Sequence, residues 1–227
     1  MNAKLVTLYL LGQVLSVFSA GVALFWSAGR IDWWPAWAAI VVWLVWFTAM
    51  DSIILRSGSG LMAERLAPPK GAKAWDRVVL SILRLTQLAR YILAGLDQRY
   101  GWTGGFPLAA QIVALVVCFL GTALFAWAMS SNAFFSQVVR VQSDSGHVVA
   151  TGGPYRYVRH PAYAGTILFE FALSTLLASW WAIITGGLCA LLLVLRTVFE
   201  DRTLQAELAG YRDYSRRVRY RLLPGIW

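Results

Sequence analysis

Charged residues are scarce in this sequence. Lysine, arginine, aspartate and glutamate make up 14% of its 227 residues, whereas hydrophobic residues make up 59%. Soluble domains usually carry about 25% charged and about 45–50% apolar residues. The composition therefore excludes an ordinary soluble domain and predicts an integral membrane protein, and the length predicts a single domain over residues 1–227.

Cysteine and histidine are also rare. The two cysteines, Cys118 and Cys189, lie inside apolar runs, and the only histidines are His147 and His160. These residues give no basis for a disulfide framework, and two histidines are too few for a metal cluster. We therefore expect any chemistry in this protein to proceed without a metal.

Long apolar runs fill most of the chain, at 5–28, 33–50, 78–96, 106–135 and 161–195. As one helix the last run would be about 52 Å long, well beyond a hydrocarbon core of about 30 Å. We expect it to fold back as a helical hairpin, with its break at Ser179 or at the pair Gly186 and Gly187. The third run is weaker, because Arg84 and Arg90 interrupt it.

The basic residues predict a topology. If the N-terminus is cytoplasmic and every run crosses, the last one twice, most of the 20 lysines and arginines fall on the cytoplasmic side, as the positive-inside rule requires. The net charge of +9 is then a topology signal and not a sign of nucleic-acid binding. The predicted fold is an all-α, polytopic membrane helix bundle with both termini and a C-terminal helix in the cytoplasm.

A polar face interrupts the third run. Arg84, Gln87 and Tyr91 follow i, i+3, i+7 spacing, which places them on one side of a helix. Such a face either packs against other helices or serves a function, and the sequence does not separate the two.

The segment GGPYRYVRHPAYAG, residues 152–165, precedes the last apolar run. Gly152, Gly153 and Pro154 predict a turn where the backbone can approach a ligand closely. Pro161 suits the first turn of the following helix. Upstream, an extended and hairpin-like stretch is expected around 143–146.

Two cations stand at the start of that helix. Arg159 and His160 lie at its N-terminus, which is a positive pole that favours anions. An anionic ligand would explain the placement. The alternative is that Arg156 and Arg159 mark the topology, while the tyrosines belong to an interfacial aromatic belt.

The tail from residue 196 onward predicts a stripe along a helix that leaves the membrane. Its members are Arg196, Glu200, Leu204, Glu207, Tyr211 and Tyr214. The alternative is a solvated face with an i, i+4 pair between Arg196 and Glu200. Gly210 could interrupt the helix. Because the hairpin brings its own ends together, the loop and the stripe should be neighbours.

These residues carry a family resemblance. GPYRYVRHPAYAG, followed by ED-x-x-L-x-x-EL-x-GY-x-x-Y and RLLPG, resembles the isoprenylcysteine carboxyl methyltransferase family, which is grouped with the phospholipid methyltransferases. The resemblance covers about residues 130–227. It implies an integral-membrane enzyme that uses S-adenosylmethionine.

The resemblance also implies site residues. The family's cofactor motif falls on Gly153, Pro154, Tyr155, Arg159, His160, Pro161 and Tyr163. Its acidic pair falls on Glu200 and Asp201, where the second member is one methylene shorter than the usual glutamate, and its tail tyrosines fall on Tyr211 and Tyr214.

The residue types suit this cofactor. Aromatic faces and carboxylates bind cations such as a sulfonium. The helix N-terminus with Arg159 suits the cofactor's carboxylate, and Glu200 suits its amino group or ribose hydroxyls. Methyl transfer is an in-line displacement that depends on positioning and requires no metal. No G-x-G-x-x-G follows a strand, which excludes a soluble Rossmann methyltransferase.

Glu170 lies well inside the last run, where a charge costs about 2.5–3.5 kcal/mol. It is either paired, with Arg84 or Arg90 as partner, or a catalytic group that orients or deprotonates the acceptor. We predict a lipophilic small-molecule or lipid acceptor on the side of residues 1–130, and the cofactor site within 131–227.

Two other functions fit parts of the sequence. Steroid 5α-reductase-like enzymes carry a similar R-H-P-x-Y and an acid-rich tail, which would imply NADPH. The acid that follows the glycine in that pattern is absent here, because Thr166 follows Gly165. A non-enzymatic membrane scaffold would use the basic segments only to set its topology.

Overall fold

The computed structural model describes residues 3–56, 71–142 and 146–227. Within these ranges the regular secondary structure is helical, and there is no strand. The helices are α1 (Ala3–Ala28), α2 (Trp34–Arg56), α4 (Ala74–Tyr100), α5 (Leu108–Ser130), the 3-10 helix η2 (Gly153–Arg156), α6 (Pro161–Leu176), α7 (Trp180–Glu207) and α8 (Tyr211–Arg217). The predicted all-α membrane bundle is confirmed.

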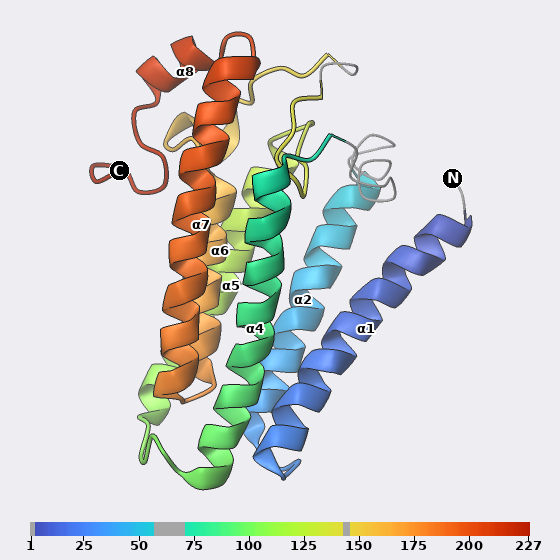
Figure 1. Ribbon diagram of the computed structural model, residues 1–227, viewed down its shortest axis with the longest axis vertical. Helices are drawn as coiled ribbons and strands as arrows, with labels where there is room; N and C mark the ends of the chain where they lie inside the picture. The colour runs from blue at the N-terminus through green and yellow to red at the C-terminus, as the bar shows by residue number, and fades with distance from the viewer. Residues whose placement is uncertain (1–2, 57–70, 143–145) are drawn as a thin grey trace.

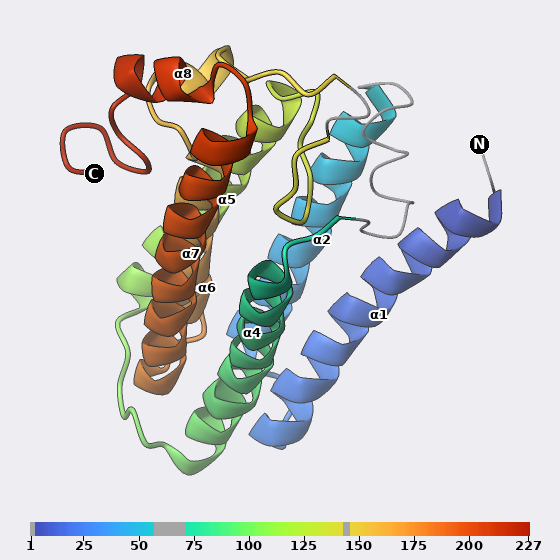
Figure 2. The same ribbon diagram turned by 45° about the horizontal axis from the view of Figure 1, so that its top comes forward.

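The long helices run up and down in one bundle, with both termini at the same end (Figure 1). Five of them, α1, α2, α4, α5 and α7, are long and apolar enough to cross a membrane. The sixth, α6, has 16 residues and packs between α5 and α7. The connection from α5 to α6, yellow in Figures 1 and 2, lies over the end of α4. The extended stretch expected at 143–146 falls largely outside the described residues.

The predicted hairpin is present, and its break is at Ser179. Ala178 adopts a left-handed φ of 57°, and the Ser179 hydroxyl caps α7 by accepting a hydrogen bond from the Ala182 N–H at 3.2 Å. The alternative break at Gly186 and Gly187 is wrong, because both glycines lie inside α7. Gly186 is instead a contact point, where an added Cβ would lie 2.4 Å from the Ser174 Oγ.

Two predicted spans were too short. The second was expected to end at Met50, but α2 continues to Arg56 because α1 supplies partners for Asp51. The Tyr9 hydroxyl and the Gln13 amide each donate to the Asp51 Oδ1 at 2.9 Å. Likewise α4 begins at Ala74, ahead of the expected start, and takes in a buried Asp76. A charged residue ends an apolar run in the sequence. It does not end the helix when neighbouring helices supply hydrogen-bond partners for the charge.

The tail is not one helix from residue 196 to the end. Gly210, at φ 80°, separates α7 from α8, and the chain then leaves helical structure after Arg217. The last residues turn back on α6, where the Arg159 and His160 N–H groups donate to the carbonyls of Tyr220 and Arg221 at 2.9 Å. The expected interruption at Gly210 is confirmed, and the C-terminal segment becomes part of the frame around the α6 N-terminus.

Helices α5 and α6 cross at two glycines. A Cβ on Gly165 would lie 2.7 Å from the Gly121 carbonyl oxygen and 2.9 Å from the Phe125 nitrogen. We expect Gly165→Ala to destabilise the protein by about 1–3 kcal/mol, since the helices must separate. Gly187→Ala is the matched control, because its Cβ would meet nothing closer than 4.0 Å. Unfolding temperatures in detergent test this, and equal shifts for the two variants would contradict it.

Candidate functional site

A hollow of about 100 Å³ lies at the end of the bundle that holds both termini. Its wall comes from the connection between α5 and α6, from η2, from the first turn of α6, from the last turns of α7, and from α8. The predicted site residues on this wall are Tyr155, Arg159, His160, Tyr163, Glu200, Tyr211 and Tyr214. The loop and the C-terminal stripe are therefore neighbours, as the hairpin predicted.

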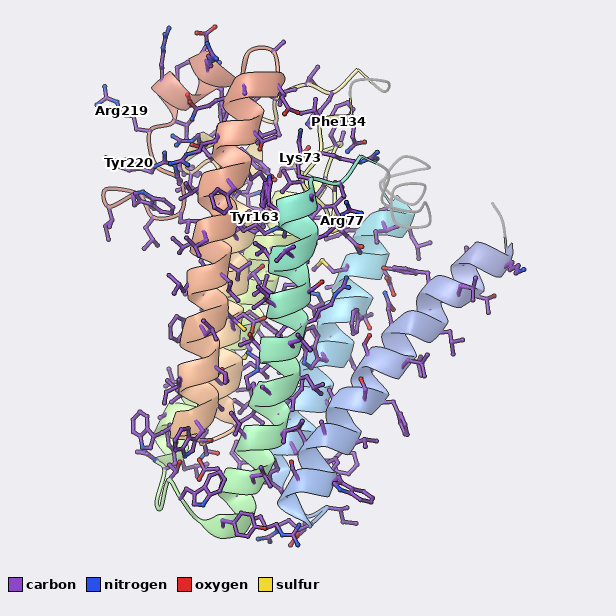
Figure 3. The ribbon with its side chains drawn as sticks, in the orientation of Figure 1. Lys73, Arg77, Phe134, Tyr163, Arg219 and Tyr220 are labelled. Carbon is purple, nitrogen blue, oxygen red and sulfur yellow. The ribbon has the colours of Figure 1, made fainter. Side chains whose placement is uncertain are left out.

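Tyr163 and Glu200 form the base of the hollow. The Tyr163 hydroxyl donates a short hydrogen bond to the Glu200 Oε2. Tyr163 lies between α7 and α4 (Figure 3), where it packs against the cluster of buried apolar residues that contains Val79 and Leu83. Its ring is parallel to that of His160, with centroids 5.8 Å apart. The other Glu200 oxygen, Oε1, has no hydrogen-bond partner in the described parts of the chain, so a half-buried carboxylate oxygen is available to a ligand.

Asp201 lies behind the wall and is fully buried. The Arg159 guanidinium donates to both of its oxygens, at 2.8 and 3.1 Å, while the Tyr211 hydroxyl donates at 2.9 Å and the Arg221 Nε at 3.0 Å. The Gln205 amide adds a further bond at 2.9 Å. Asp201 therefore holds α6, α7, α8 and the C-terminal segment together without facing the hollow.

This arrangement gives the cation at the α6 N-terminus an internal partner. Besides Asp201, the Arg159 Nη1 donates to the carbonyls of Val218 and Arg219 at 2.8 and 2.7 Å. The sequence suggested an anionic ligand to explain Arg159, whereas the structure provides the anion from α7. Arg159 still lines the hollow, but most of its donors are engaged.

Three tyrosines make the aromatic wall. The Tyr214 hydroxyl donates to the Tyr155 carbonyl at 2.8 Å, and the rings of Tyr211 and Tyr214 meet edge to face at 5.5 Å. Burial raises the pKa of all three phenols, Tyr155, Tyr211 and Tyr214, above the ordinary value. They stay neutral at physiological pH and present uncharged rings to a ligand.

Gly153, Pro154 and Pro161 lie outside the hollow's wall. An added Cβ on Gly153 would lie 2.2 Å from the Ser131 Oγ, and the residue has a φ of 54°, so the close approach is to the end of α5. Pro161 occupies the first turn of α6, as expected. Gly153 and Pro154 belong to η2, which carries Tyr155, and Pro161 belongs to the first turn of α6, which carries Tyr163.

Glu170 lies deep in the bundle and away from the hollow. The Arg90 guanidinium forms a buried ion pair with it, and the Gln87 amide donates to its Oε1 at 2.7 Å. The predicted pairing is confirmed, with Arg90 and not Arg84 as the partner. A catalytic role for Glu170 remains a prediction.

Arg196 does not pair with Glu200, because it has a better partner across the bundle. Its Nε donates to Asp76 of α4 at 2.7 Å, and its Nη2 donates to the Gln137 carbonyl at 2.8 Å. Its guanidinium also lies 5.1 Å from the centre of the Tyr163 ring. The i, i+4 spacing alone could not reveal a carboxylate 120 residues away.

The sequence missed the roof of the hollow, which the connection between α5 and α6 supplies. Among its residues are Asn132, Phe134, Ser136, His147, Val149 and Ala150. The His147 ring stacks on Phe134 at 4.8 Å, and its Nδ1 accepts a hydrogen bond from the Gln142 N–H at 3.2 Å. Figure 3 shows Phe134 above the end of α4. The one available signal was a histidine outside the apolar runs.

The pH response of His147 tests this roof. Partial burial, and then the nearby Arg140, lower the pKa of His147 below its ordinary value. A lowered pKa means that folding is penalised as the pH falls below about 6.5, where the unfolded chain binds the proton first. We expect His147→Asn, which cannot titrate, to gain stability relative to the parent protein between pH 6.5 and 5.5. Unfolding temperatures across this range check the result, and a constant difference would contradict it.

Comparison with known proteins identifies the segment that builds most of this site. Residues 112–206 match the model of the isoprenylcysteine carboxyl methyltransferase (ICMT) family. The predicted family resemblance is confirmed. This stretch contains most of α5, the roof, η2, α6 and nearly all of α7, and so it carries Tyr155, His160, Tyr163 and Glu200.

Curated relatives with this family name match the chain in part. The protein-S-isoprenylcysteine O-methyltransferase of Tribolium castaneum is 26% identical over 109 residues, which are 47% of this chain and 39% of the relative. The enzyme of the same name from Dictyostelium discoideum is 29% identical over 94 residues, covering 40% and 39% of the two chains. The matched part thus spans about two fifths of the length of these relatives.

The fold is similar over a much longer stretch. A solved structure of the eukaryotic intramembrane Ras methyltransferase ICMT aligns with 96% of this chain and 85% of its own, with a TM-score of 0.50 and 15% identity. At this identity the structural match shows only that the two proteins share a fold. That fold is the integral membrane helix bundle that the sequence predicted. The ICMT-type segment is therefore built into a bundle whose other long helices, α1, α2 and α4, lie outside the family match.

Proposed function

We propose that this protein transfers a methyl group from S-adenosylmethionine to a lipophilic acceptor at the cytoplasmic membrane face. One observation carries the proposal: the ICMT-type segment places a carboxylate oxygen, Glu200 Oε1, in a hollow walled by neutral tyrosines, and this oxygen has no partner among the described residues. A cationic ligand with an aromatic base and several hydroxyls fits such a donor set.

The residues of the hollow fit the cofactor by their chemistry. The available Glu200 oxygen suits an ammonium group or ribose hydroxyls, while Tyr163 fixes the carboxylate in place from the other side. The faces of Tyr155, Tyr211 and Tyr214 suit the base or the sulfonium. When bound, S-adenosylmethionine supplies an electrophilic methyl group on sulfur.

The protein's own contribution is positioning and exclusion of water. Asp201 fixes Arg159 and Tyr211, and these fix the wall that the cofactor would touch. An in-line displacement needs the acceptor oxygen, the methyl carbon and the sulfur aligned, and holding two reactants in this geometry is worth up to about 7–11 kcal/mol of the barrier. We assign the cofactor side to 131–227 and the acceptor side to 1–130.

The acceptor is proposed from the names of the relatives. Those proteins are named for O-methylation of an S-isoprenylcysteine, so a carboxylate joined to an isoprenoid chain is the first acceptor to test. The exposed apolar helices around the bundle suit an acceptor that arrives through the bilayer. The cytoplasmic placement rests on the distribution of basic residues along the sequence.

The test uses purified protein in detergent with methyl-labelled S-adenosylmethionine. An S-farnesylated cysteine and a total lipid extract are offered separately, and the labelled product is identified. We expect base-labile label, typical of a methyl ester, in the farnesylated cysteine. If the protein consumes NADPH and transfers no methyl group, the steroid 5α-reductase-like function is favoured instead. If it binds neither S-adenosylmethionine nor NADPH, a non-enzymatic scaffold is favoured.

A further inference from the structure

A second cavity lies within the membrane-spanning part, between α1, α2 and α4. Its volume is about 330 Å³, and it shares no lining residue with the hollow of the proposed methyl-transfer site. It is lined by Ser16, Val17, Ser19, Ala20, Trp43, Phe47, Arg84, Gln87, Leu88 and Tyr91. In Figures 1 and 2, α1 leans away from α2 and α4 towards its N-terminal end.

Arg84 brings a charge to this cavity. It lies about ten residues, or about 15 Å, from the start of α4 and is exposed. Its guanidinium makes no hydrogen bond or ion pair with any residue in the part of the chain that the structure describes. By contrast, Arg90 on the same helix is paired with Glu170. An arginine at this depth costs about 2.5–3.5 kcal/mol, and such a residue marks a candidate functional site.

The other polar groups of the cavity are already engaged. The Gln87 amide donates to Glu170 at 2.7 Å, and the Tyr91 hydroxyl accepts from the Trp43 Nε1 at 2.7 Å. Ser16 and Ser19 donate to carbonyls of their own helix at 2.8 and 3.0 Å. Arg84 is thus the charged residue in this wall, and its guanidinium donors are available to a ligand.

The remaining wall is apolar. Trp43, Phe47, Leu88, Val17 and Ala20 offer rings and aliphatic groups along α1, α2 and α4. A ligand that matches both parts has one acid group and a hydrocarbon chain. We propose that this cavity binds an anionic amphiphile, with its carboxylate or phosphate on Arg84 and its chain against Trp43 and Phe47. The proposal does not depend on the methyl-transfer function.

Variants of two arginines on α4 test the proposal. Arg84→Gln removes the charge from the cavity, and Arg84→Lys keeps it. Arg77→Gln is the matched control, because Arg77 lies two turns earlier on the same face, is exposed, and does not line the cavity. Each protein is titrated in neutral detergent with palmitate, hexadecyl phosphate or hexadecanol, and its unfolding temperature is measured.

We expect palmitate or hexadecyl phosphate to raise the unfolding temperature of the parent protein and of Arg77→Gln, because a ligand that binds only the folded state stabilises it. Arg84→Gln should bind the acid at least about ten-fold more weakly, and Arg84→Lys should retain part of the affinity. Preference for palmitate indicates a carboxylate ligand, and preference for the phosphate indicates a phospholipid headgroup.

The proposal is overturned if neither acid stabilises the parent protein, if hexadecanol stabilises it equally, or if Arg84→Gln responds as the parent does. Binding of S-adenosylmethionine to each variant is measured on the same preparations. It should be unchanged in Arg84→Gln, which shows that the variant is folded. If no protein binds S-adenosylmethionine but palmitate or hexadecyl phosphate still stabilises the parent protein, the methyltransferase proposal is contradicted and the amphiphile site is not.

Discussion

Replacing Glu200 with glutamine is expected to weaken S-adenosylmethionine binding by about ten- to a hundred-fold. A hydrogen bond to a charged group contributes about 1.5–3 kcal/mol, and glutamine keeps the shape but loses the charge. The fold should survive, because Glu200 is half-buried and its one described partner is the Tyr163 hydroxyl. Equilibrium dialysis with labelled cofactor measures the affinity directly.

Glu207→Gln is the matched control for this change. Glu207 lies two turns further along α7 and forms an exposed ion pair with Lys73 at 2.6 Å. Exposed pairs contribute about 1 kcal/mol or less to stability, and Glu207 is not on the wall of the hollow. We expect cofactor affinity in this variant to match that of the parent. Equal losses in both variants would show that Glu200 acts only through the general charge of α7.

Replacing Asp201 with alanine is expected to lower the unfolding temperature by about 6–20 °C and to abolish cofactor binding. Removing one member of a buried ion pair costs about 3–5 kcal/mol, because it leaves an uncompensated buried charge. Here the charge is Arg159, whose side chain is 5% exposed, and Arg221 loses a partner as well. The wall of the hollow then loses its attachment to α7.

The control for this variant is Asp213→Ala. Asp213 is on α8, with its side chain 77% exposed and 3.5 Å from Arg216, so its loss should change the unfolding temperature by little. Asp201→Asn keeps the shape and should fall between the alanine variant and the parent. A stable Asp201→Ala protein with normal cofactor affinity would mean that Asp201 does not organise the site.

Much of the bundle was predictable because apolar runs of span length have few alternatives in a membrane. The hairpin followed from length alone, and the structure confirms it. Helix ends were not predictable where a charge meets a distant partner: Asp51 with Tyr9 and Gln13, and Asp76 with Arg196. Local sequence shows a charge but not what lies across the bundle from it.

Much of the candidate site was predictable as well, but the partners of its charged residues were not. The loop and the stripe come together because the hairpin joins them, and Tyr155, Tyr163 and Glu200 line one hollow. The partner of Arg159 was misread, since it is Asp201 of the acidic pair and not a ligand. The roof around His147 was missed because an irregular loop has no periodicity that would place its side chains.

Photo-crosslinking of methyl-labelled S-adenosylmethionine to the purified protein tests the proposed function most directly. After ultraviolet irradiation and proteolysis, we predict label in peptides that contain Tyr155 and Tyr163, or Tyr211 and Tyr214, all on the wall of one hollow. Unlabelled cofactor should displace the label, and Glu200→Gln should reduce it. Label confined to the peptides of α1 and α2, or label that unlabelled cofactor does not displace, would contradict the assignment of this hollow as the cofactor site.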